Sequence, residues 1–318
     1  MGNLLLKTHN NMKDIILITG ANGNLAKSLG EKLSNVYTIR YLTTNKLLAN
    51  NLGYYYWDVE KEYIDKDALI GCNHIVHLAG NSILNKWTKK NKQIIYDSRI
   101  KSANMIFDKC ESLGIKINTF ISASAIGIYD EYSSLKNNEN SLIGKGWLSQ
   151  MTYDWEIAAN KFKLLGSRVV QMRISLILSK NSGFLKSNIM SIKYGIGLVL
   201  GNSKRRIHWI HIDDLIRFIE ESLKNKNYSG PYNLASDETI SQINLIKLIK
   251  TKLSPNSIII KIPIYLVKLV LGERSKIIYT DINLCVNKLK QEGFKCNYNN
   301  FNKVLENLDD KFSLVNKN

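Results

Sequence analysis

A glycine-punctuated turn between an apolar run and a helical pattern constrains this chain more than any other feature. The apolar run covers residues 15–18, and Gly20, Gly23 and Ala26 follow it in a G-x-x-G-x-x-G/A spacing. Gly20 permits a tight turn, Gly23 lets a phosphate approach the backbone, and the small Ala26 lets a helix pack close to the strand. The N-terminus of such a helix attracts an anion. The motif predicts a dinucleotide site, although an ordinary strand, turn and helix produce the same short pattern.

Strand-like and helical patterns alternate through the N-terminal half. The strand-like runs are residues 15–18, 36–42, 54–57, 75–78 and 120–123, and helical patterns such as 103–113 separate most of them. This order is typical of a parallel sheet covered by helices on both faces, which binds its ligands outside the carboxyl ends of the strands. The residues that we predict to bind a cofactor at those ends are Gly20, Asn22, Gly23, Asn24, Leu25, Asp58, Leu78, Ala79 and Gly80.

Length and composition indicate a globular protein of one or two domains. The chain has 318 residues, of which 44% are apolar, and it contains no run of 18 apolar residues that would suggest a membrane span. Residues 1–12 lack the apolar core of a signal peptide, so we expect a flexible N-terminus and a cytoplasmic protein. Four scattered cysteines show neither metal-ligand nor redox spacing, which favours free thiols and no metal site.

The formal net charge of +17 leaves three interpretations open. Lysines are spread through the chain without an Arg-rich cluster, as expected for a solvated basic surface. The charge would also attract an anionic substrate or cofactor. Specific nucleic-acid binding rests on the charge alone. We therefore expect a small-molecule substrate, with an anionic one suited to the charge, and neither a specific nucleic-acid partner nor a membrane. The sequence does not predict the oligomeric state.

Further short motifs accompany the glycine turn in a fixed order over residues 13 to about 308. They are Ile-Thr-Gly-Ala-Asn-Gly (18–23), His-Leu-Ala-Gly (77–80), Lys-Trp-Thr (86–88), Asp-Ser-Arg-Ile (97–100), Ser-Ala-Ser-Ala-Ile-Gly (122–127), Asp-Trp-Glu (154–156), Trp-Ile-His-Ile-Asp-Asp-Leu (209–215) and Tyr-Asn-Leu (232–234). With these motifs the chain resembles the short-chain dehydrogenase/reductase superfamily. It is most similar to an atypical, epimerase-like subgroup described as sugar-nucleotide epimerases or cell-division inhibitors.

The resemblance implies an α/β fold, a doubly wound parallel sheet of the Rossmann type, with a smaller C-terminal substrate lobe. The dinucleotide-binding domain would span residues 13–178 and be completed by about 205–238. The substrate lobe would comprise about 179–204 and 239–310, and residues 311–318 would form a tail.

The residue pattern beyond position 165 agrees with this division. Residues 168–174 and 209–212 are strand-like, and 213–223 is a helical pattern with Asp213 as a plausible N-cap. From residue 241 onward the apolar spacing is helical and ends in the stripe 301–308, which we assign to core packing.

Classical members of the superfamily use a serine, a tyrosine and a lysine four residues after the tyrosine. Tyrosine has a pKa near 10, and the ammonium group favours the phenolate that acts as the base. Here Ser124 matches the serine and Tyr153 lies near the tyrosine position, but Ile157 replaces the lysine. The resembled subgroup is known for this loss. Tyr129, which follows the Ser124 strand, or a lysine of residues 86–92 would then have to supply a proton.

Three further residues match subgroup motifs and are candidates for substrate binding. Arg99 suits bidentate binding of phosphate or carboxylate, although a surface ion pair would explain it equally well. Trp87 and His211 are the other two, and a histidine at the start of a helix often has a structural role. The subgroup's Ala-Gly-Glu-Asn reads Ala-Gly-Asn-Ser at 79–82, and residues 204–206 read Lys-Arg-Arg. Both departures favour a more anionic ligand, or reflect drift.

The loop after the second strand favours NADP over NAD. NAD-specific proteins place an acid there to bind the ribose hydroxyls, whereas residues 43–46 read Thr-Thr-Asn-Lys. Arg40 or Lys46 would attract a 2′-phosphate.

We therefore predict an NAD(P)-binding oxidoreductase or epimerase-like protein that acts on a small molecule and lacks the standard Tyr-x-x-x-Lys pair. The alternative is a non-catalytic NAD(P)-binding protein with a regulatory or structural role.

Overall fold

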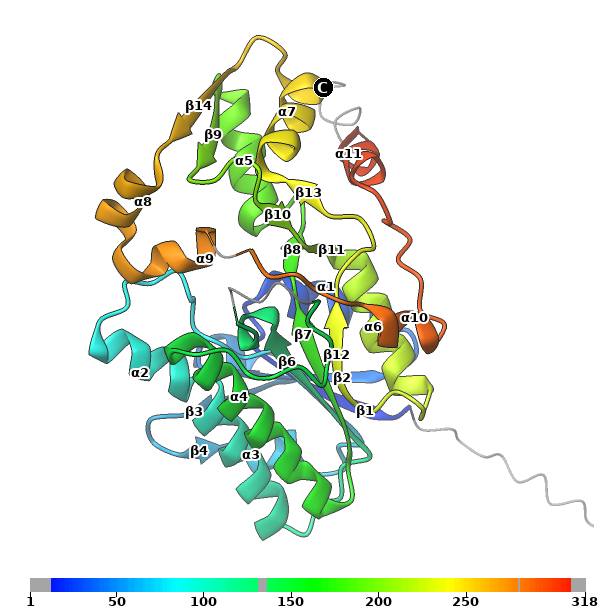
Figure 1. Ribbon diagram of the computed structural model, residues 1–318. Coiled ribbons are helices and arrows are strands. Elements are labelled where there is room, and N and C mark those ends of the chain that lie inside the picture. Colours follow the sequence, from blue (N-terminus) through cyan, green and yellow to red (C-terminus); the bar gives the residue numbers. More distant parts are fainter. Residues whose placement is uncertain (1–12, 131–135, 280, 310–318) are drawn as a thin grey trace, which may run out of the picture.

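The computed structural model describes residues 13–130, 136–279 and 281–309 (Figure 1). The expected flexible N-terminus, 1–12, and the tail, 311–318, lie outside these residues. In the part of the chain that is described, no helix is long and apolar enough to span a membrane.

An eight-stranded sheet forms the centre of the larger lobe, in the order β12-β7-β6-β5-β1-β2-β3-β4. All neighbouring strands pair in parallel except β3 and β4. The strands are β1 (Ile15–Thr19), β2 (Thr38–Thr43), β3 (Tyr54–Asp58), β4 (Tyr63–Ile64), β5 (His74–His77), β6 (Thr119–Ala125), β7 (Arg168–Ile174) and β12 (Gly230–Leu234). The order of strands reverses between β1 and β5, so their carboxyl ends flank the switch point at which doubly wound sheets bind ligands. The predicted fold class is confirmed.

Both faces of the sheet are buried, because alternate residues of the central strand enter different cores. Ile16 and Ile18 pack with α1 (Asn24–Leu33) and α6 (Ile212–Lys224). Leu17 packs on the other face with α3 (Ile100–Ser112) and η4 (Lys161–Leu165). Helix α4 (Trp147–Asn160) lies against α3 (Figure 1). The remaining short elements of this lobe are α2 (Lys89–Asp97), η1 (Leu48–Asn50), η2 (Lys66–Ala68) and η3 (Ile126–Ile128).

A smaller lobe with its own apolar core lies beyond the carboxyl ends of the strands (Figure 1). Its core joins α5 (Gly183–Lys193), α7 (Gln242–Leu253) and α11 (Phe301–Asp309) to the parallel pair β9 (Ile196–Leu200) and β14 (Ile258–Ile262). The other elements of this part of the chain are β8 (Leu176–Leu178), β10 (Arg206–Ile207), β11 (Trp209–His211), β13 (Ile240–Ser241), α8 (Ile264–Leu271), η5 (Gly272–Ser275), α9 (Lys276–Tyr279) and α10 (Asn287–Gln291).

The strand-like run at Trp209 forms β11, which pairs with β8, while β12 forms one edge of the large sheet. The structure differs from the sequence-based expectation in two places. Helix α6 begins at Ile212, and its N-cap is His211 rather than Asp213, because the His211 Nδ1 atom accepts a hydrogen bond from the Asp213 N–H at 3.3 Å. The antiparallel edge strand β4 was not predicted, since two residues carry no periodic pattern.

One buried hydrogen-bond chain ties β1, β5 and α3 together at the switch point. The Thr19 hydroxyl accepts from the N–H groups of Leu78 and Ala79, at 3.0 and 2.9 Å. Its own proton is therefore directed to His77 Nδ1, 3.0 Å away. The His77 ring then carries its proton on Nε2, which lies 3.3 Å from the carbonyl oxygen of Arg99, at the start of α3. This chain fixes the two strand ends relative to the following helix.

The buried His77 and the half-buried His208 couple the stability of the fold to pH. Burial lowers the pKa of His77 to about 4, and burial next to Arg206 lowers the pKa of His208 to about 4. Both side chains stay neutral in the folded protein, whereas in the unfolded chain they take up protons near pH 6.5. The unfolded state therefore binds more protons between these pH values, and the free energy of unfolding falls as the pH falls from about 6.5 toward 4.

We expect urea unfolding monitored by circular dichroism to show this loss between pH 7.5 and pH 5. His77→Gln should remove about 2 kcal/mol of the pH-dependent loss, because the histidine contribution follows from a pKa of about 4 in the folded state and 6.5 in the unfolded state. His208→Gln serves as the matched variant away from the switch point. An unchanged pH dependence in His77→Gln would show that His77 is protonated in the folded protein.

Candidate functional site

The glycine turn has the geometry of an open anion-binding turn. Gly20 has a φ of +76°, and a Cβ atom there would lie 3.0 Å from the carbonyl oxygen of Leu78. Its carbonyl oxygen accepts a hydrogen bond from the Gly23 N–H at 2.8 Å. Gly23 is the N-cap of α1, and the first turn of this helix has neither a side-chain cap nor an acidic residue. The N–H groups of the first turn are therefore open to an anion without an internal competitor.

The other predicted residues of the turn lie around this helix start. Asn22 is exposed, whereas Asn24 and Leu25 are half-buried at the beginning of α1. The Asn24 amide donates to the Ser179 hydroxyl at 3.3 Å, which links the turn to the segment that leads into the smaller lobe. Ala79 is buried beside the Gly20 backbone. The structure thus brings the predicted residues of β1 and β5 together.

Asp58, at the end of β3, is half-buried and engaged locally. Its carboxylate accepts hydrogen bonds from the N–H groups of Glu60 and Lys61, each at 3.1 Å, and from the Tyr56 hydroxyl at 3.2 Å. The Lys61 N–H is the main cause that lowers the pKa of Asp58, so the group is an anion at neutral pH. Asp58 is therefore a fixed acceptor at the carboxyl end of β3, and these three partners all lie within residues 56–61.

Of the two basic residues considered for a 2′-phosphate, only Lys46 lies after the second strand. Its ammonium group is 5.5 Å from the ring centre of Tyr56. Arg40 sits within β2 and donates to the carbonyl oxygens of Asp67 and Ile70 at 2.8 and 2.6 Å. The structure therefore removes Arg40 from the cofactor candidates, because its guanidinium is used to hold the loop that precedes β5.

Ser124 belongs to a buried polar network rather than to an open surface. Its hydroxyl donates to Glu156 Oε1 at 2.7 Å, and Arg173 binds both oxygens of that carboxylate at 2.8 Å. Arg173 also donates to the Tyr129 hydroxyl at 2.8 Å, which in turn donates to Asn233 Oδ1 at 2.6 Å. Burial opposes the charge of Arg173, but Glu156 outweighs it and raises the pKa of the guanidinium.

The environment of Tyr129 does not favour the role of a base. Burial raises the pKa of this phenol to about 12, and its proton is already donated to Asn233. Helix α4 turns Tyr153 and Ile157 outward, with exposed fractions of 37% and 44%, whereas Glu156, which contacts Ser124, is buried. Among the described residues, Ser124 makes its hydrogen bond to Glu156 and none to Tyr153.

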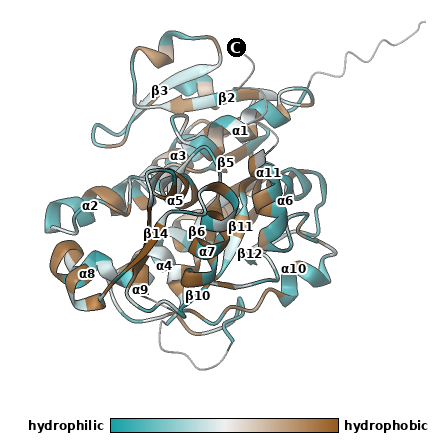
Figure 2. Cartoon of the chain, turned by 90° about the horizontal axis from the view of Figure 1, so that it is seen from above, coloured by the Kyte–Doolittle hydropathy of each residue, from teal (hydrophilic) through white to brown (hydrophobic). Residues whose placement is uncertain are grey.

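A cavity of about 140 Å³ opens between the N-terminus of α4 and the α8–α9 region. Trp87 and Trp147 form one wall with their ring centres 5.0 Å apart, and the Lys92 ammonium lies 5.4 Å from the Trp147 ring. Lys92 also forms an ion pair with Glu273 at 2.5 Å, which connects α2 to η5. Figure 1 shows the α9 segment between α8 and α2, and Figure 2 shows α8 as strongly hydrophobic. Sequence reasoning identified Trp87 but missed the wall that Trp147 and Glu273 supply.

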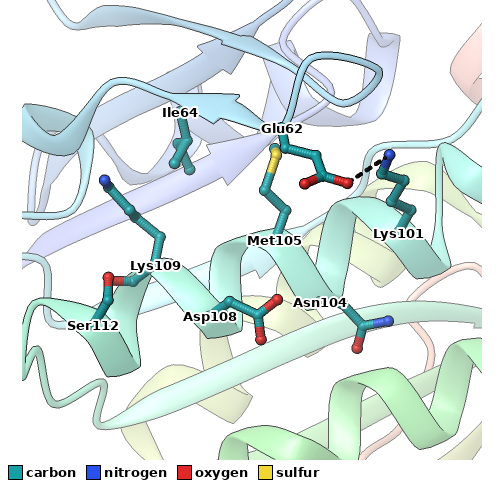
Figure 3. Close-up of a pocket in the computed structure, with 8 residues that line it drawn as sticks. All are labelled: Glu62, Ile64, Lys101, Asn104, Met105, Asp108, Lys109 and Ser112. Atoms are coloured by element: carbon teal, nitrogen blue, oxygen red, sulfur yellow. Dashed lines mark hydrogen bonds and ion pairs between the residues drawn. The ribbon is translucent and has the colours of Figure 1, made fainter.

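A second hollow, of about 290 Å³, lies between β4 and α3 (Figure 3). Its charges compensate each other, as in the ion pair between Glu62 and Lys101 at 2.9 Å. None of the predicted site residues lines it. The candidate site is therefore the crevice at the strand ends together with the cavity at Trp87.

His211 has a structural role at the start of α6. It is buried, caps α6 and stacks on Tyr298 with 3.7 Å between the ring centres. Burial lowers the pKa of His211. Among the described residues, no group of three or more His, Cys, Asp or Glu side chains is placed to hold a metal ion.

Comparison with known proteins identifies the family. Residues 16–235 match the NAD dependent epimerase/dehydratase family. An epimerase family protein of Staphylococcus haemolyticus is 31% identical over 301 residues, which cover 92% of this chain and 98% of that protein. A homologue from Staphylococcus epidermidis is 32% identical over 300 residues, with the same coverage. These matches confirm the resemblance to epimerase-like proteins.

Solved structures agree with the fold. A human epimerase family protein, solved with NADPH, superimposes with a TM-score of 0.81 at 17% identity, covering 93% of this chain and 99% of that one. The dTDP-4-dehydrorhamnose reductase of Bacillus anthracis, in complex with NADP, gives a TM-score of 0.72 at 18% identity, covering 93% of this chain and 98% of that one. On the family match and the curated relatives together, the chain belongs to the NAD dependent epimerase/dehydratase family, whose cofactor is NAD(P).

Proposed function

We propose that the protein binds a nicotinamide dinucleotide, NADP in preference to NAD, at the switch point between β1 and β5. We further propose that it acts on a small molecule bound in the cavity at Trp87. The observation that carries this proposal is the open turn at Gly20 and Gly23, which leaves the first-turn N–H groups of α1 open to an anion. The smaller lobe, about 179–204 and 239–310, would then form the substrate side of the site.

The residues present fit a dinucleotide. Gly20 admits the turn only without a side chain, and a Cβ on Gly23 would come near nothing but the Gly20 carbonyl oxygen, at 3.2 Å. The helix N-terminus and the two glycines would hold the pyrophosphate, while Asp58 and the backbone of Leu78 and Ala79 would line the nucleosides. A nicotinamide ring supplies hydride transfer when it is bound.

The preference for NADP rests on charge. Residues 43–46 place no carboxylate after β2, and the Lys46 ammonium lies at that strand end above the Tyr56 ring. A carboxylate would repel a 2′-phosphate, whereas an ammonium group attracts one.

The catalytic part of the proposal is a site without the Tyr-x-x-x-Lys pair. On α4 the residue that contacts Ser124 is Glu156. The residues one and two turns before it on the same helix, Thr152 and Leu148, have no ionisable side chain. Among the lysines of residues 86–92, Lys92 lines the cavity. It would bind an anionic group of the substrate there. A reaction at this site would need little assistance from a general base.

A second candidate function is favoured by the same network. Because the hydroxyl protons of Ser124 and Tyr129 are both donated to protein groups, the site could bind a dinucleotide without catalysing a reaction. A non-catalytic, regulatory NAD(P)-binding protein would retain the glycine turn and the cavity. Hydride transfer to or from the bound nicotinamide separates the two functions.

Gly23→Asp should weaken NADPH binding at least tenfold in calorimetry, because it places a negative charge at the helix start where the pyrophosphate would lie. Asn118→Asp adds the same charge directly before β6, at the amino end of that strand and away from the carboxyl ends, and should bind NADPH like the wild type. Equal binding by the wild type and Gly23→Asp would mean that the dinucleotide binds elsewhere.

Fluorescence titration should show that NADPH binds at least as tightly as NADH. Lys46→Glu should weaken NADPH binding about tenfold, which is about 1.4 kcal/mol, and leave NADH binding nearly unchanged. A tenfold preference of the wild type for NADH would contradict the proposal.

Tyr153→Phe should change the rate of NADPH oxidation less than twofold with any carbonyl compound that the wild type reduces, because Tyr153 is exposed and the Ser124 hydroxyl is bonded to Glu156 instead. The exposed Tyr265→Phe on α8 is the control for loss of a phenol. A tenfold loss in Tyr153→Phe alone, with a basic limb near pH 7 in the wild type, would restore Tyr153 as the base.

A further inference from the structure

Arg99 places its guanidinium directly against the backbone of Gly80. A Cβ atom on Gly80 would lie 3.0 Å from both Cζ and Nη2 of Arg99, so a side chain there would push the guanidinium by a few tenths of an ångström. The ring centre of Trp155 is 5.2 Å from Cζ. The side chain is therefore held between a strand end and a helix.

The charge of Arg99 is not neutralised by the protein. Its Nη1 atom donates to the carbonyl oxygen of Ile95 at 3.0 Å and to the Ser98 hydroxyl at 3.3 Å. Within residues 13–130, 136–279 and 281–309, Nε and Nη2 make no hydrogen bond and no carboxylate pairs with the group. Burial lowers the pKa of Arg99 to about 10, so it remains a cation at neutral pH. Arg173, by contrast, is fully paired with Glu156.

The backbone of Arg99 is fixed to the switch point. Its carbonyl oxygen lies 3.3 Å from Nε2 of His77. The hydroxyl of the neighbouring Ser98 accepts a hydrogen bond from the Asn81 N–H at 2.8 Å. The Gly20 turn touches Leu78 and Ala79, and the next residue, Gly80, touches the guanidinium. The unused edge of Arg99 is thus one residue beyond the contact of the glycine turn with β5.

We propose that Arg99 and Gly80 form a binding site for a phosphate or carboxylate oxygen beside the glycine turn. The free Nε–Nη2 edge offers two parallel N–H groups, the arrangement that binds such groups bidentately. The site rests on the proposed function, since its ligand is either the pyrophosphate of the dinucleotide or an anionic group of a second ligand that binds with it. One bound anion would explain both the small residue at Gly80, beside the guanidinium, and the unpaired positive charge of Arg99.

The test is calorimetric titration of three full-length proteins, the wild type, Arg99→Gln and Arg99→Lys. Each is titrated first with NADPH. Inorganic pyrophosphate is then titrated into the NADPH-saturated protein and, separately, into the free protein. Arg99→Lys keeps the charge but loses the planar pair of donors, and it guards against misfolding of Arg99→Gln. Lys163→Gln, which removes one positive charge from the exposed η4 segment before β7, is the control. Thermal melts establish that each variant is folded.

The proposal expects one of two results. If Arg99 holds the cofactor, Arg99→Gln weakens NADPH binding at least tenfold, Arg99→Lys weakens it less, and pyrophosphate competes with NADPH. If Arg99 holds a second ligand, NADPH binding stays within twofold, and pyrophosphate binds the NADPH complex of the wild type but not that of Arg99→Gln.

Two results would overturn the site: both ligands bind Arg99→Gln as they bind the wild type, or Lys163→Gln loses as much affinity as Arg99→Gln. Failure of the wild type to bind any nicotinamide dinucleotide would instead contradict the proposed function. In that case the binding of pyrophosphate to the free protein tests the anion site. Pyrophosphate binding that is lost in Arg99→Gln supports the site, and a wild type that does not bind pyrophosphate overturns it.

Discussion

The hydrogen-bond chain from Thr19 to His77 is the interaction on which the site depends. It joins the ends of β1 and β5 where the order of strands reverses, and it requires a neutral imidazole because the Thr19 proton is donated to Nδ1. The same ring meets the carbonyl oxygen of Arg99, so the glycine turn and the start of α3 share one fixed frame. A crevice for a ligand forms at this frame because neighbouring parallel strands diverge there into helices on opposite faces of the sheet.

Two arginines near the strand ends differ in how their charge is paired, and this difference separates a structural role from a binding role. Arg173 meets a bidentate carboxylate and a phenol, and this network fixes Ser124 and Tyr129 in place. A buried charge without a partner is costly, which is why pairs of this kind are kept intact in protein interiors. Among the residues that the structure describes, Arg99 has only two acceptors, both on one nitrogen, and leaves an edge unpaired. The larger electrostatic gain on ligand binding is therefore expected at Arg99.

The cavity at Trp87 comes from segments that are far apart in the chain. Trp147 lies at the start of α4, and Glu273 in η5 reaches across to Lys92 on α2. Helix α8, which contacts η5, is apolar over most of its length (Figure 2). Because the smaller lobe contributes one wall and the larger lobe the other, the shape of the cavity depends on how the two lobes pack.

Elements whose signals are local could be predicted from the sequence. The glycine spacing at Gly20 and the alternation of strands and helices predicted the parallel sheet, because backbone freedom and side-chain periodicity act over a few residues. The pairing of β12 with β7, the burial of Tyr129 and the position of Arg99 against Gly80 could be seen only in the folded chain. These outcomes depend on contacts between residues distant in the chain, whose burial and charge pairing no local pattern records.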